Sequence, residues 1–257
     1  MTDEALADEW RAVEARKQPV IDDATEQIAG VFGQHVDRVV QQLEEQKAVK
    51  QDFTVGSVLE MGDLLDDLQR VLSDVAMEAL RQGFQTGLDR TGANADFNAG
   101  DPDVQETIRR ILSEHAESIE STTLDDLRRE ITQGLDENET INQIQSRVRG
   151  YMEDAESNRS RLIAQTTATA GFENGQLQSF REAGFERKRW ISQRDSNVRE
   201  SHEEADGQEV ALEMPFTVGG ASLMHPADPS GPADEVARCR CTMFPVREGR
   251  DAEGFTP

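Results

Sequence analysis

The feature that most constrains this fold is the regular spacing of its few large apolar residues. From residue 21 to residue 43 they recur three, four or seven positions apart, at Ile21, Ile28, Phe32, Val36, Val39 and Leu43. This spacing places them on one face of an α-helix, and a second stripe of the same kind runs through residues 55–88. The sequence therefore predicts long amphipathic helices that bury their apolar faces against one another.

The same periodicity argues against disorder, which the composition alone would favour. The 257 residues include 51 acidic and 27 basic side chains, the formal net charge is −24, and 36% of the residues are hydrophobic. High charge with low hydrophobicity is typical of disordered chains, but those chains lack sustained helical spacing. No stretch approaches the roughly 20 apolar residues of a membrane helix, and the first residues do not resemble a signal peptide. We expect a folded protein with no membrane span.

The basic residues give a further indication. The lysines are Lys17, Lys47, Lys50 and Lys188, and every other basic residue is an arginine. An acidic surface with few lysines fits a protein adapted to molar salt, because the Debye length at 1 M is only about 3 Å and self-repulsion is screened. The alternative is an acidic protein of ordinary ionic strength.

Capping residues and loops divide the helical part. Thr140, just before Ile141, has the position of an N-cap, and Gly184 has that of a glycine that ends a helix. Pro19 is expected near the start of a helix, because proline lacks the N–H that a helix interior uses. The predicted helices are 4–16, 19–46, 55–88, 102–118, 123–135, 141–151 and 157–183.

The chain changes character after Gly184. Strands are predicted at 188–192, 208–212 and 239–246, and the Gly- and Pro-rich residues 214–237 are expected to be mostly loop. The fold class is therefore α+β, with a mostly α-helical N-terminal part and a small antiparallel sheet module at the C-terminus. The expected domains are an elongated helical region, 1–120, a second domain, 121–247, with its β module from about 185, and a tail, 248–257.

This small β module has too few apolar residues for a large core of its own. We expect it to dock on the helix predicted at 157–183, where four apolar side chains would be buried against the sheet: Leu162, Ile163, Leu177 and Phe180. The division into two regions further predicts that residues 1–120 form helices that do not depend on the module.

Both cysteines and two of the four histidines lie in the segment from residue 190 to residue 241. Cys239 and Cys241 are two positions apart, so on a strand their side chains would share one face. With His202 and His225 they could supply the four ligands of a tetrahedral Zn²⁺ site, which would stabilise a sheet with little core. The alternative is a pair of half-buried thiols, with the histidines bonded to the backbone.

Polar residues of the same segment admit two interpretations. Asp195, Arg199, His202 and Asp206 could form a functional cluster, or Asp195 could pair with Arg199 and hold a capped turn in place. No nucleophile motif and no glycine-rich phosphate loop accompanies them.

A local run of basic residues could contact DNA. Arg187, Lys188 and Arg189 are its centre, with Arg240 as a further candidate. The alternative is that these side chains pair with acidic groups of the same chain or of a protein partner.

Taken together, the residues of this segment resemble the phage Mu F-like minor head protein family, also described as phage head morphogenesis proteins. The resemblance covers about residues 124–246 and consists of a tryptophan strand, the spacing D-x-x-V-R-x-x-H, a D-G turn and a C-R-C-T strand. The matching residues are Trp190, Asp195, Val198, Arg199, His202, Asp206, Gly207, Cys239, Arg240, Cys241 and Thr242.

This resemblance implies a virion protein of a tailed double-stranded DNA virus, not an enzyme. Such a protein would lie inside the head near the portal vertex, in a few copies, and in the host cytoplasm during assembly. It would assist head assembly and DNA packaging or ejection. Its expected partners are the portal protein and the major capsid protein, with packaged DNA as a further candidate and no membrane. With the acidic composition, the resemblance indicates a virus of a halophilic, archaeal host.

Two other classes of function stay open. A metal-dependent nuclease or hydrolase could draw a general base and a metal-bound water from His202 and Asp195, although cysteine ligands usually mark structural zinc sites. The other is an acidic helical adaptor.

Overall fold

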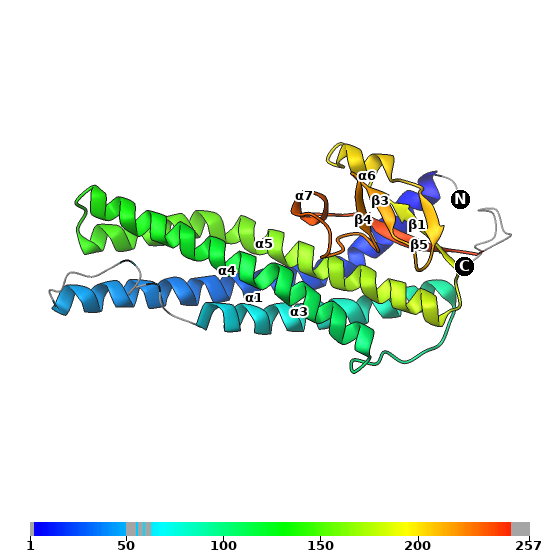
Figure 1. Cartoon of the computed structure of the whole chain (residues 1–257), viewed down its shortest axis with the longest axis horizontal. Coiled ribbons are helices and arrows are strands. Elements are labelled where there is room, and N and C mark those ends of the chain that lie inside the picture. The colour runs from blue at the N-terminus through cyan, green and yellow to red at the C-terminus, as the bar shows by residue number, and fades with distance from the viewer. Residues whose placement is uncertain (1–2, 50–54, 56–58, 60–62, 248–257) are drawn as a thin grey trace.

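The structure is a computed structural model that describes residues 3–49, 55, 59 and 63–247. Its elongated body consists of helices α1 (Asp3–Val49), α3 (Asp63–Thr91), α4 (Pro102–Asp136) and α5 (Ile141–Glu182), with a small β module at one end (Figure 1). This is the predicted α+β architecture. Part of the predicted helix 55–88, including Val58 and Met61, lies outside the described residues, as does the predicted tail 248–257.

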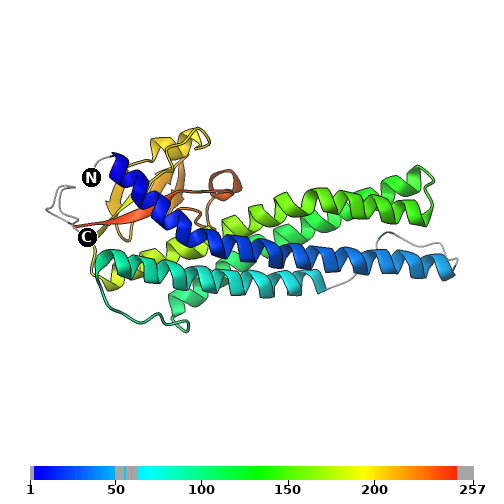
Figure 2. The same cartoon turned by 180° about the vertical axis from the view of Figure 1, so that it is seen from behind.

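The long helices continue through several predicted breaks. Helix α1 contains Pro19 in its interior and bends along its length (Figure 2), as helices with an internal proline do. Helix α4 joins the two helices predicted at 102–118 and 123–135, so residue 120, the predicted domain boundary, falls inside it. Helix α5 likewise joins two predicted helices, and its start at Thr140 is a complete capping box with Gln143. Polar stretches stay helical here because neighbouring turns pack on other helices.

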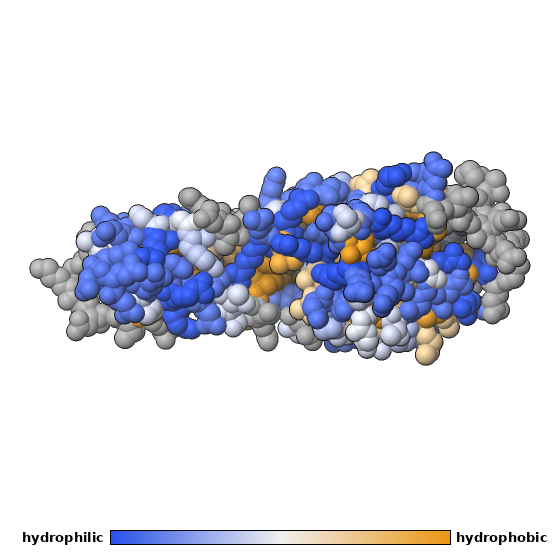
Figure 3. Space-filling view, turned by 90° about the horizontal axis from the view of Figure 1, so that it is seen from above, coloured by the Kyte–Doolittle hydropathy of each residue, from blue (hydrophilic) through white to orange (hydrophobic). Residues whose placement is uncertain are grey.

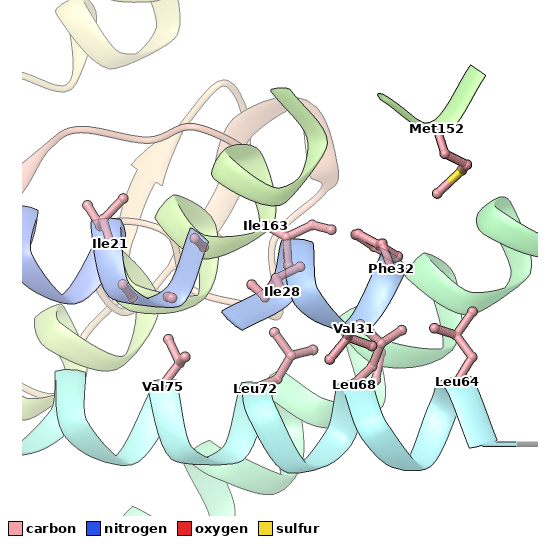
Figure 4. Packing of buried hydrophobic residues seen from close by; sticks show 14 of the residues in the cluster. Ile21, Ile28, Val31, Phe32, Leu64, Leu68, Leu72, Val75, Met152 and Ile163 are labelled. Carbon is pink, nitrogen blue, oxygen red and sulfur yellow. The ribbon is translucent and has the colours of Figure 1, made fainter. Parts of the chain in front are cut away.

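The predicted apolar stripes form the main core. Side chains of α1, α3 and α5 point toward one another between the helices (Figure 4), and nearly all of their surface is buried. Those labelled in the figure are Ile21, Ile28, Val31, Phe32, Leu64, Leu68, Leu72, Val75, Met152 and Ile163.

Glycines let α3 and α5 approach very closely, and this is the most extensive contact between elements. A Cβ atom at Gly83 would lie 1.9 Å from the carbonyl oxygen of Phe172, and one at Gly175 would lie 2.1 Å from that of Leu80. Both distances are far below contact distance, so only glycine fits. Each helix carries two such glycines four residues apart: Gly83 and Gly87 on α3, Gly171 and Gly175 on α5.

The β module contains two small sheets. Strands β1 (Arg187–Ile191), β2 (Glu209–Ala211) and β5 (Thr242–Val246) form an antiparallel sheet in the order β2-β1-β5, with Trp190 opposite Met243. Strands β3 (Phe216–Val218) and β4 (Ala221–Leu223) form a hairpin, and the short helices are α6 (Glu200–Glu204) and α7 (Ala233–Val236).

The module differs from the prediction in two places. The hairpin and α7 lie in the segment expected to be mostly loop, and the hairpin turn is made by Gly219 and Gly220, both with positive φ. Cys239 and Cys241 precede β5 instead of lying on it, so their convergence comes from a loop and not from strand alternation.

The module docks on the helices as expected. Leu177 and Phe180 of α5 belong to one core cluster with Trp190, Phe216 and Met243, and Ile163 belongs to a second cluster with Ile191 and Phe244. Leu162, by contrast, is only half-buried.

Helix α1 also contacts the module, which was not expected. The indole N–H of Trp10 donates a 2.7 Å hydrogen bond to the carbonyl oxygen of Arg240. The part of α1 that precedes Pro19 and packs beside the module (Figure 2) is called the N-terminal arm below. This arm links the first helix to the segment that carries the cysteines.

The surface agrees with the composition. The face seen in Figure 3 is mostly hydrophilic, with apolar side chains in small separate patches. Among the described residues, no helix combines the length and the apolar character that a bilayer crossing requires.

Candidate metal centre

Three potential metal ligands converge inside the β module. His202 comes from α6, and Cys239 and Cys241 come from the segment between α7 and β5. The Nδ1 atom of His202 is 3.3 Å from Sγ of Cys241 and 3.8 Å from Sγ of Cys239. One ligand atom from each residue lies within 4.8 Å of the other two. This His-Cys-Cys cluster could hold a metal ion.

Two further side chains, Glu235 and Trp190, contact His202 of the cluster. The Nε2 atom of His202 is 3.1 Å from Oε2 of Glu235 on α7, and the hydroxyl of Ser201 donates to the same oxygen at 2.8 Å. The ring of Trp190 meets the His202 ring edge-on, with 5.6 Å between the ring centroids. Sequence reasoning missed Glu235, because its role depends on where α7 packs.

The two thiols have different acidities. A hydrogen bond from Cys241 holds the pKa of Cys239 well below its ordinary value, whereas burial and the neighbouring Cys239 raise the pKa of Cys241. Burial acts to lower the pKa of His202, but its bond to Cys239 and the charge of that thiolate raise the pKa above its ordinary value. The cluster therefore already favours one thiolate, the form that binds a metal.

Hydrogen bonds and ion pairs from polar side chains hold in place the loops that carry the cluster. Asp195 pairs with Arg240 through two 3.1 Å contacts and accepts the backbone N–H of Asn197 at 3.0 Å. Arg199 donates to the carbonyl oxygen of Ala237. The predicted pairing of Asp195 with Arg199 is therefore wrong, although the interpretation as a fastened turn holds.

Asp206 belongs to a different turn from Asp195. It accepts the backbone N–H of Ser192 at 2.8 Å and pairs with Arg194 at 2.8 Å, just before Gly207, whose φ is +79°. These contacts hold the end of β1 beside the turn that leads to β2. Asp206 thus supports the sheet and does not join the His-Cys-Cys cluster.

His225 lies outside the cluster. Its Nδ1 contacts the carbonyl oxygen of Pro226 at 2.9 Å, and its Nε2 is 3.5 Å from the side-chain amide of Asn174. Burial lowers the pKa of His225, which favours a neutral ring with both nitrogens engaged. The structure therefore brings together three of the four predicted ligands, and His225 instead fits the alternative of a histidine bonded to the backbone.

A buried ion pair lies at the junction of α1, α5 and β5. Nζ of Lys17 is 3.6 Å from Oε1 of Glu173, and these side chains are 1% and 0% exposed. Glu173 also accepts from the hydroxyl of Thr242 at 3.1 Å and from the backbone N–H of Met243 at 3.2 Å. Burial raises the pKa of Glu173 to about 7, although Lys17 opposes this shift. This carboxylate secures the start of β5 directly after Cys241.

The basic run predicted to contact DNA is paired within the module. Arg187 and Arg189 both contact the carboxylate of Glu209 on β2. Lys188 is fully buried and donates to the carbonyl oxygen of Met224 at 2.6 Å, and burial lowers its pKa to about 8. These contacts are those of the alternative interpretation, in which the run pairs with groups of the same chain.

The burial of the His-Cys-Cys cluster limits its chemistry. His202, Cys239 and Cys241 are 2%, 1% and 2% exposed, so a polymer or other large substrate cannot reach an ion among them. A metal held there would cross-link α6 to the segment before β5. Three protein ligands leave one position of a tetrahedral zinc ion open, as catalytic sites do, so burial is the observation that favours a structural role.

Residues 125–244 match the family described as Phage Mu protein F like protein. The chain carries a Phage Mu F-like domain. This match confirms the resemblance to phage head morphogenesis proteins. The Mu F-like domain begins inside α4 and ends in β5, so it contains α5, most of the β module and the whole His-Cys-Cys cluster.

Part of the chain is also similar to a protein of a different kind. The NAD(+)–arginine ADP-ribosyltransferase EFV of Enterococcus faecalis (strain ATCC 700802 / V583) is 37% identical over 67 residues. That stretch is 26% of this chain and 14% of that protein, so the chain spans only a small part of the relative. No solved structure matches the chain.

Proposed function

We propose that this protein is a minor capsid protein of a tailed double-stranded DNA virus, located inside the head near the portal vertex. The observation that carries the proposal is the Mu F-like domain at residues 125–244, which contains the His-Cys-Cys cluster and its fastened loops. In this role the protein assists head assembly and DNA packaging or ejection.

The proposed partners are the portal protein and the major capsid protein. The long helices carry dense acidic side chains, and a chain with a net charge of −24 is repelled by duplex DNA. The basic run at 187–189 is already paired inside the module. Protein contacts along the helices are therefore a better basis for function than direct binding of packaged DNA.

Mass spectrometry of purified virus particles tests this proposal. The chain should be present in DNA-filled heads, in a few copies relative to the portal protein, and should remain after external proteins are digested away. Its absence from intact particles, or its removal by external protease, would overturn the proposed location.

A metal-dependent nuclease or hydrolase is the second candidate, and the site argues against it. Asp195, the residue available to pair with His202 in catalysis, is held by Arg240, and the ligands are buried. We propose that the protein is not an enzyme. Cleavage of DNA by the pure protein with Zn²⁺, Mg²⁺ or Mn²⁺, abolished by Asp195→Asn, would establish the enzyme instead.

We further propose that the metal is a single structural Zn²⁺ ion, because two sulfurs and an imidazole are ligands that zinc prefers. The acidic, lysine-poor composition supports a host that lives in molar salt, as in halophilic archaea.

A further inference from the structure

We infer that Glu235 is a positioning residue that holds His202 ready for a Zn²⁺ ion in the His-Cys-Cys cluster. The inference rests on the proposed zinc site and adds the residue that orients its histidine. Glu235 would not touch the ion itself.

The spacing of the three ligand atoms suits zinc without a large rearrangement. Zn–S bonds of about 2.3 Å and Zn–N bonds of about 2.0 Å at tetrahedral angles place nitrogen and sulfur about 3.5 Å apart. The two observed distances from Nδ1 of His202, 3.3 Å and 3.8 Å, lie on either side of that value. Zinc needs only small movements of side chains that are already buried.

Glu235 fixes the histidine. A metal-bound histidine usually donates its second ring N–H to a carboxylate, which sets both the tautomer and the orientation of the ring. Here Nδ1 faces both sulfurs, and Nε2 lies 3.1 Å from Oε2 of Glu235 without the alignment of a hydrogen bond. With a metal ion bound, a proton on Nε2 facing this carboxylate would leave the Nδ1 lone pair for the ion. The hydroxyl of Ser201 holds the carboxylate in turn at 2.8 Å.

Three protein ligands leave one position of a tetrahedral ion to a solvent molecule. Because the ligands are at most 2% exposed, that molecule would be enclosed by the module. The site therefore links α6, α7 and the segment before β5 around one ion.

The test measures Zn²⁺ affinity of the full chain by competition with a chelator, together with the absorption spectrum of the Co²⁺-substituted protein. Glu235→Gln keeps the shape of the side chain but removes its charge, and should weaken Zn²⁺ binding by about 10- to 100-fold. Asp234→Asn is the matched control, because it removes one charge from an exposed neighbour on the same helix. It should leave the affinity unchanged.

A shift of the cobalt–thiolate absorption in Glu235→Gln should accompany the weaker binding, because the ring of His202 loses the carboxylate that orients it. One further variant defines the ligand set. His225→Asn should retain one equivalent of zinc, because His225 is not a ligand in this arrangement.

Equal affinities for Glu235→Gln and Asp234→Asn, or an unchanged cobalt spectrum for Glu235→Gln, would refute the positioning role. Failure of the wild-type chain to bind zinc would refute the site as well. Neither result bears on whether the protein is found in virus particles, so the location of the protein is tested independently.

Discussion

Replacing Gly175 by alanine should separate helices α3 and α5. The added Cβ would lie 2.1 Å from the carbonyl oxygen of Leu80 and 2.8 Å from the backbone nitrogen of Phe84. Ordinary contact begins at 3.4 Å, and both partners are backbone atoms that no side-chain rotation can move away. The helices must therefore move apart by about 1 Å, which loosens packing along their whole contact.

Two opposing effects set the magnitude. Overpacking of a core costs about 1–3 kcal/mol. Alanine in place of glycine in a helix contributes about 1 kcal/mol in the stabilising direction. Since the clash here involves backbone on both sides, we expect the upper end of the cost and a net loss of about 2 kcal/mol in the free energy of unfolding.

Gly150 provides the matched control on the same helix. A Cβ added there meets nothing within 4 Å, so Gly150→Ala should stabilise the protein by about 0.5–1 kcal/mol through helix propensity alone. Urea unfolding followed by circular dichroism measures both variants. If Gly175→Ala proves as stable as Gly150→Ala, the close packing of α3 on α5 is not as described.

Three other perturbations have defined outcomes. Trp190→Ala should lower the free energy of unfolding by about 3–5 kcal/mol, because the indole is fully buried. Limited proteolysis should then cut first after about Gly184 and leave a helical fragment. Simultaneous digestion of the helices and the β module would mean that they form one cooperative unit. The pKa of Lys188 is about 8 in the folded protein and 10.5 ordinarily, so the unfolded chain binds more protons between these pH values. The free energy of unfolding should therefore rise by about 3 kcal/mol as pH increases from about 8 to about 10.5. This rise should be missing in Lys188→Met, and a variant with the same pH profile as the wild type would contradict the burial of this amine. Thermal stability should increase from about 0.1 M to about 2 M KCl, because salt screens the acidic helices, and equal or lower stability would count against a host in molar salt.

The long helices could be predicted because their apolar residues repeat with the helical period and lie in the core, as Ile28 and Phe32 do. The ends of those helices were less predictable. Pro19 and the polar stretch near Ser118 remain helical because packing on other helices outweighs weak local preferences. The glycines of α3 and of α5 are each spaced by four residues, and this spacing is visible in the sequence. It predicts a close helix–helix contact, but the sequence does not say which two helices make it.

The sequence predicted which types of residue could bind a metal in the candidate site, but it did not predict which side chains contact one another there. His202, Cys239 and Cys241 stand out because cysteine and histidine are rare in this chain. The partner of Asp195 was mistaken because nearby Arg199 is the obvious choice by helical spacing, whereas Arg240 is 45 positions away. His225 was predicted as a ligand and lies outside the cluster, whereas Glu235 was not predicted and contacts His202. The reason is the same, because only the packing of α7 and the neighbouring loops decides which side chain meets His202.

The hydrogen bond between Trp10 and the carbonyl oxygen of Arg240 joins positions 230 residues apart. A ribosome that adds about 5–20 residues per second needs roughly 10–50 s to make the intervening chain. During that interval the N-terminal arm has left the ribosome while its docking surface does not yet exist. The first helix to be synthesised is therefore among the last to be completed, and the growing chain must keep the indole of Trp10 exposed until the cysteine segment arrives.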